Sequence, residues 1–141
     1  MKSKNVIACI TAQEACLNII NAAKKMAEKL GSGVKIVTVQ PKTVDANTRA
    51  ADLKCLYTLA NASSCNIDII YCEDITSALS SYISKQSACL IYIGTPDISS
   101  TFFKQFMKCE YNVPISVVNS KIIYTLPPCE ISLQELNQSI E

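Results

Sequence analysis

The chain of 141 residues has no histidine, no tryptophan and only three glycines. Without histidine the commonest general base of enzymes is missing, and the carboxylates form no recognisable catalytic motif. The glycine-rich phosphate loops and the G-x-S-x-G nucleophile motif are absent as well. We therefore expect no catalytic residues and no enzyme activity.

The sequence also lacks an excess of charge of one sign and long apolar runs. The 13 basic and 12 acidic residues leave a net charge of +1, and no run of Lys and Arg exceeds two residues. A nucleic-acid surface needs clustered basic residues. No segment reaches the about 18 apolar residues of a membrane span, and Val6 to Ile10 is too short for a signal-peptide core. We expect a cytoplasmic protein that binds neither nucleic acid nor membrane.

Cysteine is abundant, by contrast. The eight cysteines are Cys9, Cys16, Cys55, Cys65, Cys72, Cys89, Cys109 and Cys129. None forms a C-x-x-C pair, whereas zinc sites use closely spaced Cys and His ligands. The pattern favours small buried hydrophobic residues over a metal or redox site, and free thiols are typical of a reducing compartment. We predict no metal.

Short apolar, β-branched runs alternate with helical segments along the chain. Strands are expected at 5–10, 34–39, 67–72, 89–93 and 114–118, and helices at about 14–30, 46–64, 75–83 and 99–108. Such alternation predicts a single-domain α/β protein, a three-layer α/β/α sandwich around a five-stranded parallel sheet.

Several local details follow from the pattern. Thr11 to Glu14 has the S/T-x-x-E form of a capping box for the first helix, and the glycines at 31 and 33 end that helix. The second helix is expected to bury a stripe that includes Leu56 and Tyr57.

The tail differs from the rest. Residues 1–121 are expected to form the domain, and 122–141 a C-terminal extension that begins with a short extended piece up to Leu126. Pro127 and Pro128 follow, and then a short amphipathic helix with Leu133 and Leu136 on its apolar side. This helix covers either its own domain or a second subunit.

A ligand site is expected where the order of parallel strands reverses, beyond their carboxyl ends. If the first strand is central, this point lies between the first and fourth strands. The residues predicted there are Ile10, Thr11, Ala12 and Gln13 after the first strand, Val39 and Gln40 after the second, Gly94, Thr95 and Pro96 after the fourth, and Ser99 and Ser100 at the next helix start.

Gly94 has two interpretations. A glycine at a strand end lets the backbone approach a ligand, and hydroxyls at a helix start join backbone amides in holding an anion. On the residues alone we favour the simpler interpretation, in which 94–97 is a turn and Ser99 an N-cap.

Four segments are similar, in order and spacing, to a known domain. They are Val6 to Gln13 with its T-x-Q turn, Leu53 to Ala60, Ile67 to Ile75, and Cys89 to Pro96 with its Gly-x-Pro turn. Over about residues 5–118 they resemble the universal stress protein (Usp) domain of Kdp-type potassium-sensor histidine kinases. The resemblance implies the Usp, adenine nucleotide alpha hydrolase-like fold with strand order 3-2-1-4-5, and a homodimer through the last strand.

The resemblance also implies a signalling or ligand-binding module, with an adenine nucleotide (ATP, AMP or a cyclic dinucleotide) as the candidate ligand. Thr11 stands where ATP-binding members have aspartate, and Asp97 and Met107 stand where they have phosphate-wrapping glycines. These departures argue against the usual ATP mode. A protein-interaction module with a vestigial pocket therefore stays open, and a nucleotide hydrolase is the third hypothesis.

Overall fold

The computed structural model describes residues 4–94, 114–118 and 123–126. The elements are β1 (Asn5–Cys9), the 3₁₀ turn η1 (Glu14–Cys16), α1 (Leu17–Leu30), β2 (Gly33–Gln40), α2 (Ala46–Ser63), β3 (Ile67–Tyr71), α3 (Ile75–Lys85), β4 (Ala88–Gly94), β5 (Ile115–Val118) and β6 (Ile123–Leu126). The helices predicted at 99–108 and in the C-terminal tail lie outside the described residues.

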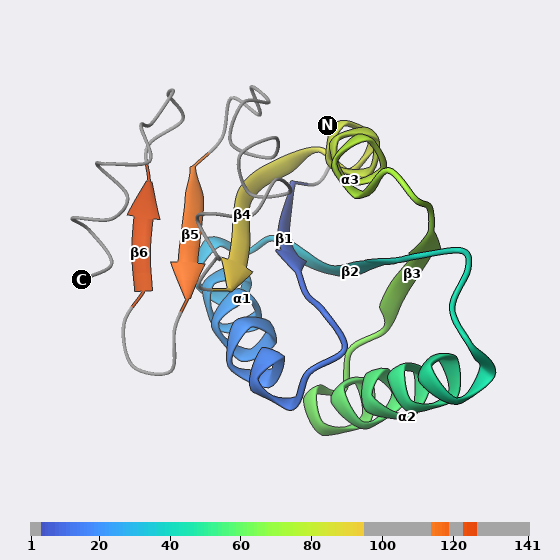
Figure 1. Ribbon diagram of the computed structural model, residues 1–141. Coiled ribbons are helices and arrows are strands. Elements are labelled where there is room, and N and C mark those ends of the chain that lie inside the picture. The colour runs from blue at the N-terminus through green and yellow to red at the C-terminus, as the bar shows by residue number, and fades with distance from the viewer. Residues whose placement is uncertain (1–3, 95–113, 119–122, 127–141) are drawn as a thin grey trace.

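The strands form one sheet with the order β3-β2-β1-β4-β5-β6 (Figure 1). The pairs β3–β2, β2–β1, β1–β4 and β4–β5 are all parallel, which confirms the predicted five-stranded parallel sheet and its order. The extended piece of the tail is a sixth strand, because β6 pairs antiparallel with β5. The boundary between residues 121 and 122 stays a prediction, although β6 adds to the same sheet.

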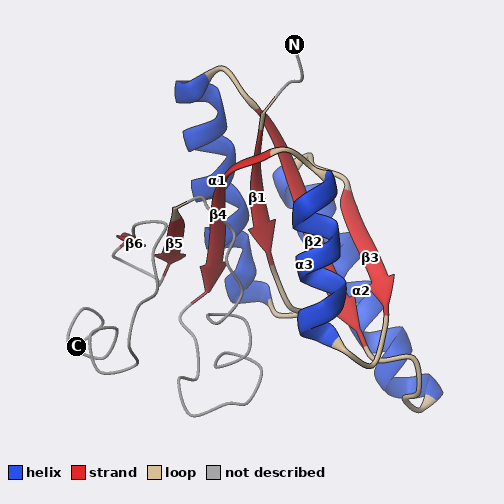
Figure 2. Cartoon of the chain, turned by 90° about the horizontal axis from the view of Figure 1, so that it is seen from above, coloured by secondary structure: helices blue, strands red, loops and turns tan. Residues whose placement is uncertain are grey.

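The helices lie on both faces of the sheet. Figure 2 shows α1 and α2 behind the strands and α3 in front of them. Alternate residues of the strands therefore enter two separate cores: Val6 and Ala8 pack with α1 and α2, whereas Ile7 packs with α3. This three-layer arrangement agrees with the prediction.

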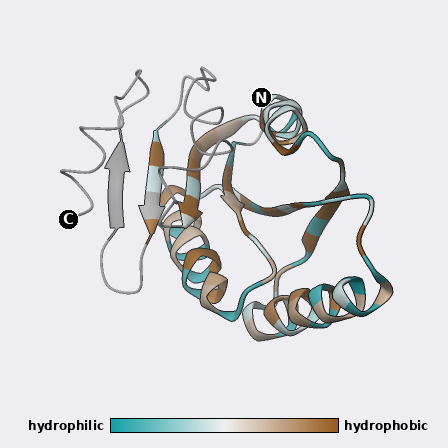
Figure 3. Cartoon of the chain, viewed as in Figure 1, coloured by the Kyte–Doolittle hydropathy of each residue, from teal (hydrophilic) through white to brown (hydrophobic). Residues whose placement is uncertain are grey.

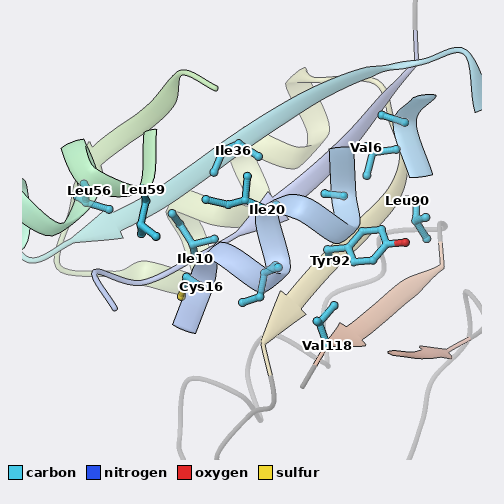
Figure 4. Packing of buried hydrophobic residues seen from close by; sticks show 14 residues of the cluster. Val6, Ile10, Cys16, Ile20, Ile36, Leu56, Leu59, Leu90, Tyr92 and Val118 are labelled. Carbon is cyan, nitrogen blue, oxygen red and sulfur yellow. The ribbon is translucent and has the colours of Figure 1, made fainter. Parts of the chain in front are cut away.

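The larger core lies between the sheet and the pair α1 and α2 (Figure 4). Leu56 and Leu59 approach from α2, and Tyr92 fills the side near β4, with Ile20 and Ile36 between them. The strands at the centre of the sheet are mostly apolar, as Figure 3 shows by their brown colour. Such runs suit strands that are covered on both faces.

The helix boundaries have clear local causes. Gly31 ends α1 in the left-handed conformation with φ of 64°, as its sequence position predicts. Asp45 accepts a hydrogen bond from Thr48 N at 2.8 Å and caps α2. Asp74 does the same for α3 through Ser77 N at 3.0 Å.

The predicted capping box at Thr11–Glu14 is wrong. Gln13 is the N-cap of η1 and makes no side-chain capping bond, and the chain passes through this 3₁₀ turn before α1 begins at Leu17. The Thr11 hydroxyl lies 3.6 Å from Cys16 Sγ instead. Thr11 therefore does not hold the N-cap position, because Gln13 is the N-cap of η1 and Cys16 is the N-cap of α1.

The predicted stripe on α2 is wrong in one position. Tyr57 is 70% exposed, while Leu56, Leu59 and Ser63 are buried. Positions 56, 59 and 63 repeat at three and four residues and share one helix face, whereas Tyr57 lies about 100° around the helix from Leu56.

Six cysteines fall within the described residues, and all six are free thiols. Cys16 is buried and the others are partly buried. Among the described residues no three His, Cys, Asp or Glu side chains are placed to hold a metal ion. No described helix is both long and apolar enough to cross a membrane.

Two positions of α1 should differ in how much their side chains contribute to the stability of the fold. Ile20 is fully buried and Leu30 is 55% exposed. Ile20→Ala should lower the free energy of unfolding by about 2–5 kcal/mol, because it leaves a cavity, and the control Leu30→Ala should change it by less than about 0.5 kcal/mol. Urea unfolding followed by circular dichroism measures both, and equal losses would contradict the assignment of the buried face.

Candidate functional site

The carboxyl ends of β1, β2 and β4 meet at one edge of the sheet. Cys9 pairs with Val37 on one side and with Ile93 on the other, and Ile10 N donates to Val37 O at 2.9 Å. The chain order reverses here, because β1 has β2 on one side and β4 on the other. This is the predicted switch point.

Seven of the predicted site residues lie at this edge: Ile10, Thr11, Ala12, Gln13, Val39, Gln40 and Gly94. The other four, Thr95, Pro96, Ser99 and Ser100, lie outside the described residues. The structure thus brings together the ends of β1, β2 and β4, and contact with a ligand stays a prediction.

The loop after β1 exposes some of these residues and hides one. Ile10 is 5% exposed and belongs to the core, whereas Thr11 and Gln13 are exposed. Gln13 N donates to Thr11 O at 2.9 Å, and Cys16 N donates to Gln13 O at 3.0 Å. These backbone bonds hold the loop as it turns from β1 into η1.

The end of β2 carries a buried polar pair. Gln40 Nε2 donates to Thr38 Oγ1 at 2.8 Å, and the two residues are 7% and 1% exposed. Both side chains point to the α1 and α2 face, as Ile36 does, since alternate residues of a strand share a face. Val39 points the opposite way and packs against the core under α3.

Gly94 has a packing role that the sequence did not reveal. A Cβ built on Gly94 would lie 2.9 Å from Cδ1 of Ile19 in α1. The missing side chain therefore allows α1 to approach the end of β4. The structure thus supplies a reason for this glycine within the fold itself, whether or not a ligand approaches its backbone.

The loop after β2 is held by residues that sequence reasoning missed. Arg49 Nη2 donates to Pro41 O at 2.7 Å and to Lys42 O at 3.0 Å, and its guanidinium lies 4.4 Å from the ring centre of Tyr71. Glu73 Oε1 accepts hydrogen bonds from two consecutive backbone amides of this loop, at 2.8 and 3.2 Å. These contacts fix the loop beside Gln40.

Two titratable groups near the sheet remain neutral. Burial raises the pKa of Cys9, at the end of β1, to about 12, so its thiol is not a nucleophile at neutral pH. Burial raises the pKa of Tyr82, and the hydrogen bond that Tyr82 Oη donates to Asp68 Oδ2 at 2.7 Å raises it further.

The seven described site residues have uncharged side chains, so this part of the site suits a neutral group better than a phosphate.

The limited space at Gly94 predicts that a shorter side chain at position 19 compensates for a larger one at position 94. Gly94→Ala should lower the free energy of unfolding by about 1 kcal/mol, because the end of the Ile19 side chain must move away from the new methyl group. Ile19→Val removes the contacting Cδ1 atom, so the double variant Gly94→Ala with Ile19→Val should lose less than the sum of the two single losses. Strict additivity of the three unfolding free energies would contradict this contact.

The similarity of this chain to known proteins lies in its structure. No protein-family model matches this chain, and no curated protein matches it either. A universal stress protein from Archaeoglobus fulgidus superposes with a TM-score of 0.63 at 12% identity, covering 84% of this chain and 100% of its own.

Two complexes are similar as well. The universal stress protein from Archaeoglobus fulgidus in complex with dAMP has a TM-score of 0.62 at 12% identity, over 84% of this chain and 98% of its own. A universal stress protein in complex with cAMP has a TM-score of 0.63 at 11% identity, with the same two coverages of 84% and 98%. This chain therefore has the fold of the universal stress proteins, as predicted.

Proposed function

We propose that this chain is a non-catalytic, universal-stress-protein-like module that binds a small adenine nucleotide and acts in signalling. The observation that carries the proposal is a shared fold: two of the similar structures hold dAMP and cAMP, and each covers 84% of this chain. The kinship with the Usp domain of Kdp-type sensor kinases belongs to the same proposal and rests on the sequence resemblance. The cytoplasmic location is also part of the proposal and is supported by the many free thiols of the sequence.

The chemistry of the switch point supports a ligand with little phosphate charge. The described site residues are uncharged, and Thr11 replaces the aspartate of ATP-binding members. In the sequence, Asp97 adds a negative charge where a phosphate-wrapping glycine is expected. A monophosphate or a cyclic nucleotide carries less negative charge than ATP, so we favour these ligands over ATP.

Thermal unfolding with ATP, AMP, cAMP and cyclic di-AMP tests the proposal. A ligand at about one hundred times its dissociation constant stabilises the folded chain by about 2.7 kcal/mol, which raises the melting temperature visibly. We expect this rise with AMP or a cyclic nucleotide. No rise with any of the four would contradict nucleotide binding and favour a protein-interaction module with a vestigial pocket.

Two charge variants locate the site. Thr11 is exposed at the end of β1, and Asn66 is exposed in the turn before β3, which lies at the amino ends of the strands. Thr11→Glu should abolish the nucleotide-induced rise, because it adds a negative charge beside the phosphate. Asn66→Glu is the matched control and should keep the full rise. The reverse result would place the nucleotide at the other end of the sheet.

The proposed homodimer needs a different strand from β5. β5 is already paired with β4 on one edge and with β6 on the other, so both of its edges are occupied by its own chain. β6 is the last strand of the described sheet. We therefore propose that a second copy pairs with the outer edge of β6, since an edge strand presents backbone donors and acceptors.

Sedimentation equilibrium checks the proposed dimer. We expect a mass twice the 15.4 kDa of the chain at micromolar concentrations. A mass of one chain at every concentration would contradict the dimer, and it would mean that β6 closes the sheet without a partner.

A further inference from the structure

The described core contains few polar side chains, and most of them have a local explanation. The buried polar residues are Thr38, Gln40, Ser63 and Ser116. Ser63 donates to Leu59 O at 2.7 Å within its own helix, and Ser116 shares a hydrogen bond with the Tyr92 hydroxyl. The pair of Thr38 and Gln40 remains, and it lies at the switch point.

Burying the Gln40 amide is costly unless its polar atoms are hydrogen-bonded. The bond to Thr38 Oγ1 uses one of the two N–H donors of the amide. Within the part of the chain that the structure describes, the Gln40 side chain makes no other hydrogen bond. Among the described residues, the second N–H and the carbonyl oxygen of Gln40 have no hydrogen-bond partner, and a bound group could use both atoms.

Its position places Gln40 beside the loop that leaves β1. Val37 is level with Cys9, the last residue of β1, and Gln40 lies three positions further along β2. Gln40 O also accepts from Cys72 N at 3.0 Å, and this bond fixes the backbone between β1 and β3.

A primary amide offers a donor and an acceptor side by side. Adenine presents the same pair in complementary order, an amino donor next to a ring-nitrogen acceptor, and glutamine binds it with two hydrogen bonds. Guanine presents two acceptors on the corresponding edge, which Arg or Lys reads best. Neither Arg nor Lys is among the predicted site residues.

We propose that Gln40 reads the adenine base, and that Thr38 is a positioning residue that holds the Gln40 amide in the reading orientation. The inference rests on the proposed nucleotide binding and adds its specificity. The Gln40 carbonyl accepts from the adenine amino group, and its free N–H donates to a ring nitrogen. In the orientation that the structure shows, the Thr38 hydroxyl accepts the other N–H and so holds the amide in place.

Calorimetric titration with AMP and IMP tests the inference, because IMP carries a carbonyl oxygen in place of the adenine amino group. For the unaltered chain we expect AMP to bind about 10- to 100-fold more tightly than IMP. The double variant Thr38→Val with Gln40→Leu should bring this ratio close to one. Removing both partners of the buried hydrogen bond together leaves no unpaired polar atom, so the fold should be retained.

Two further variants sharpen the test. Thr38→Val alone keeps the reading amide but loses its anchor, and it should reduce the AMP to IMP ratio part of the way. Gln86→Leu removes an amide beyond the end of α3, near the opposite end of the sheet, and should leave the ratio unchanged. Melting temperatures confirm that each variant is folded.

The outcomes separate the two proposals. If the unaltered chain binds neither AMP nor IMP, nucleotide binding is wrong and the inference falls with it. If it prefers AMP and the double variant keeps the same ratio, nucleotide binding stands and Gln40 is not the reading residue. If Thr38→Val keeps the AMP to IMP affinity ratio of the unaltered chain while this ratio falls to about one in the double variant, only the positioning role of Thr38 is wrong.

Discussion

The pairing of β1 with a parallel neighbour on each side is the constraint on which the rest of the structure depends. Val6, Ile7 and Ala8 are fully buried, because β2 and β4 cover the edges of β1 and helices cover both faces of the sheet. A strand with no access to water must be short and apolar throughout. From this one strand follow the order of the sheet and the point where that order reverses.

Much of this arrangement could be predicted from the sequence, because it depends on local patterns. The apolar runs marked the five parallel strands, and Gly31 marked the end of α1. The errors arose where contacts with residues distant in the sequence determine which face of an element is buried. Tyr57 matches an apolar stripe by composition, yet the face that α2 turns to the sheet is set by Leu56 and Leu59.

The position of the switch point was predictable from the sequence, but the contacts around it were not. The switch point follows from the strand order, whereas the bonds of Arg49 and Glu73 to the loop after β2 depend on the folded arrangement. Glu73 lies about thirty residues along the sequence from the backbone amides that donate hydrogen bonds to it. No local spacing in the sequence therefore reveals this contact. Gly94 shows the same limit, because the side chain that would crowd a Cβ at this position is Ile19, which is distant in the sequence and belongs to α1.

The uncharged character of the end of β2 agrees with the burial of Thr38 and Gln40. Burying a charged group as deeply as Gln40 would cost a large desolvation free energy. Burying an amide costs less, and its hydrogen bond to Thr38 offsets part of that cost. An amide also does not ionise in the physiological range, so its donor and acceptor are the same at every pH that the folded chain meets. On the proposal that Gln40 reads the adenine base, its neutral amide separates recognition of the base from the charge of the phosphate. Selectivity between bases would then be independent of the phosphate groups that the nucleotide carries.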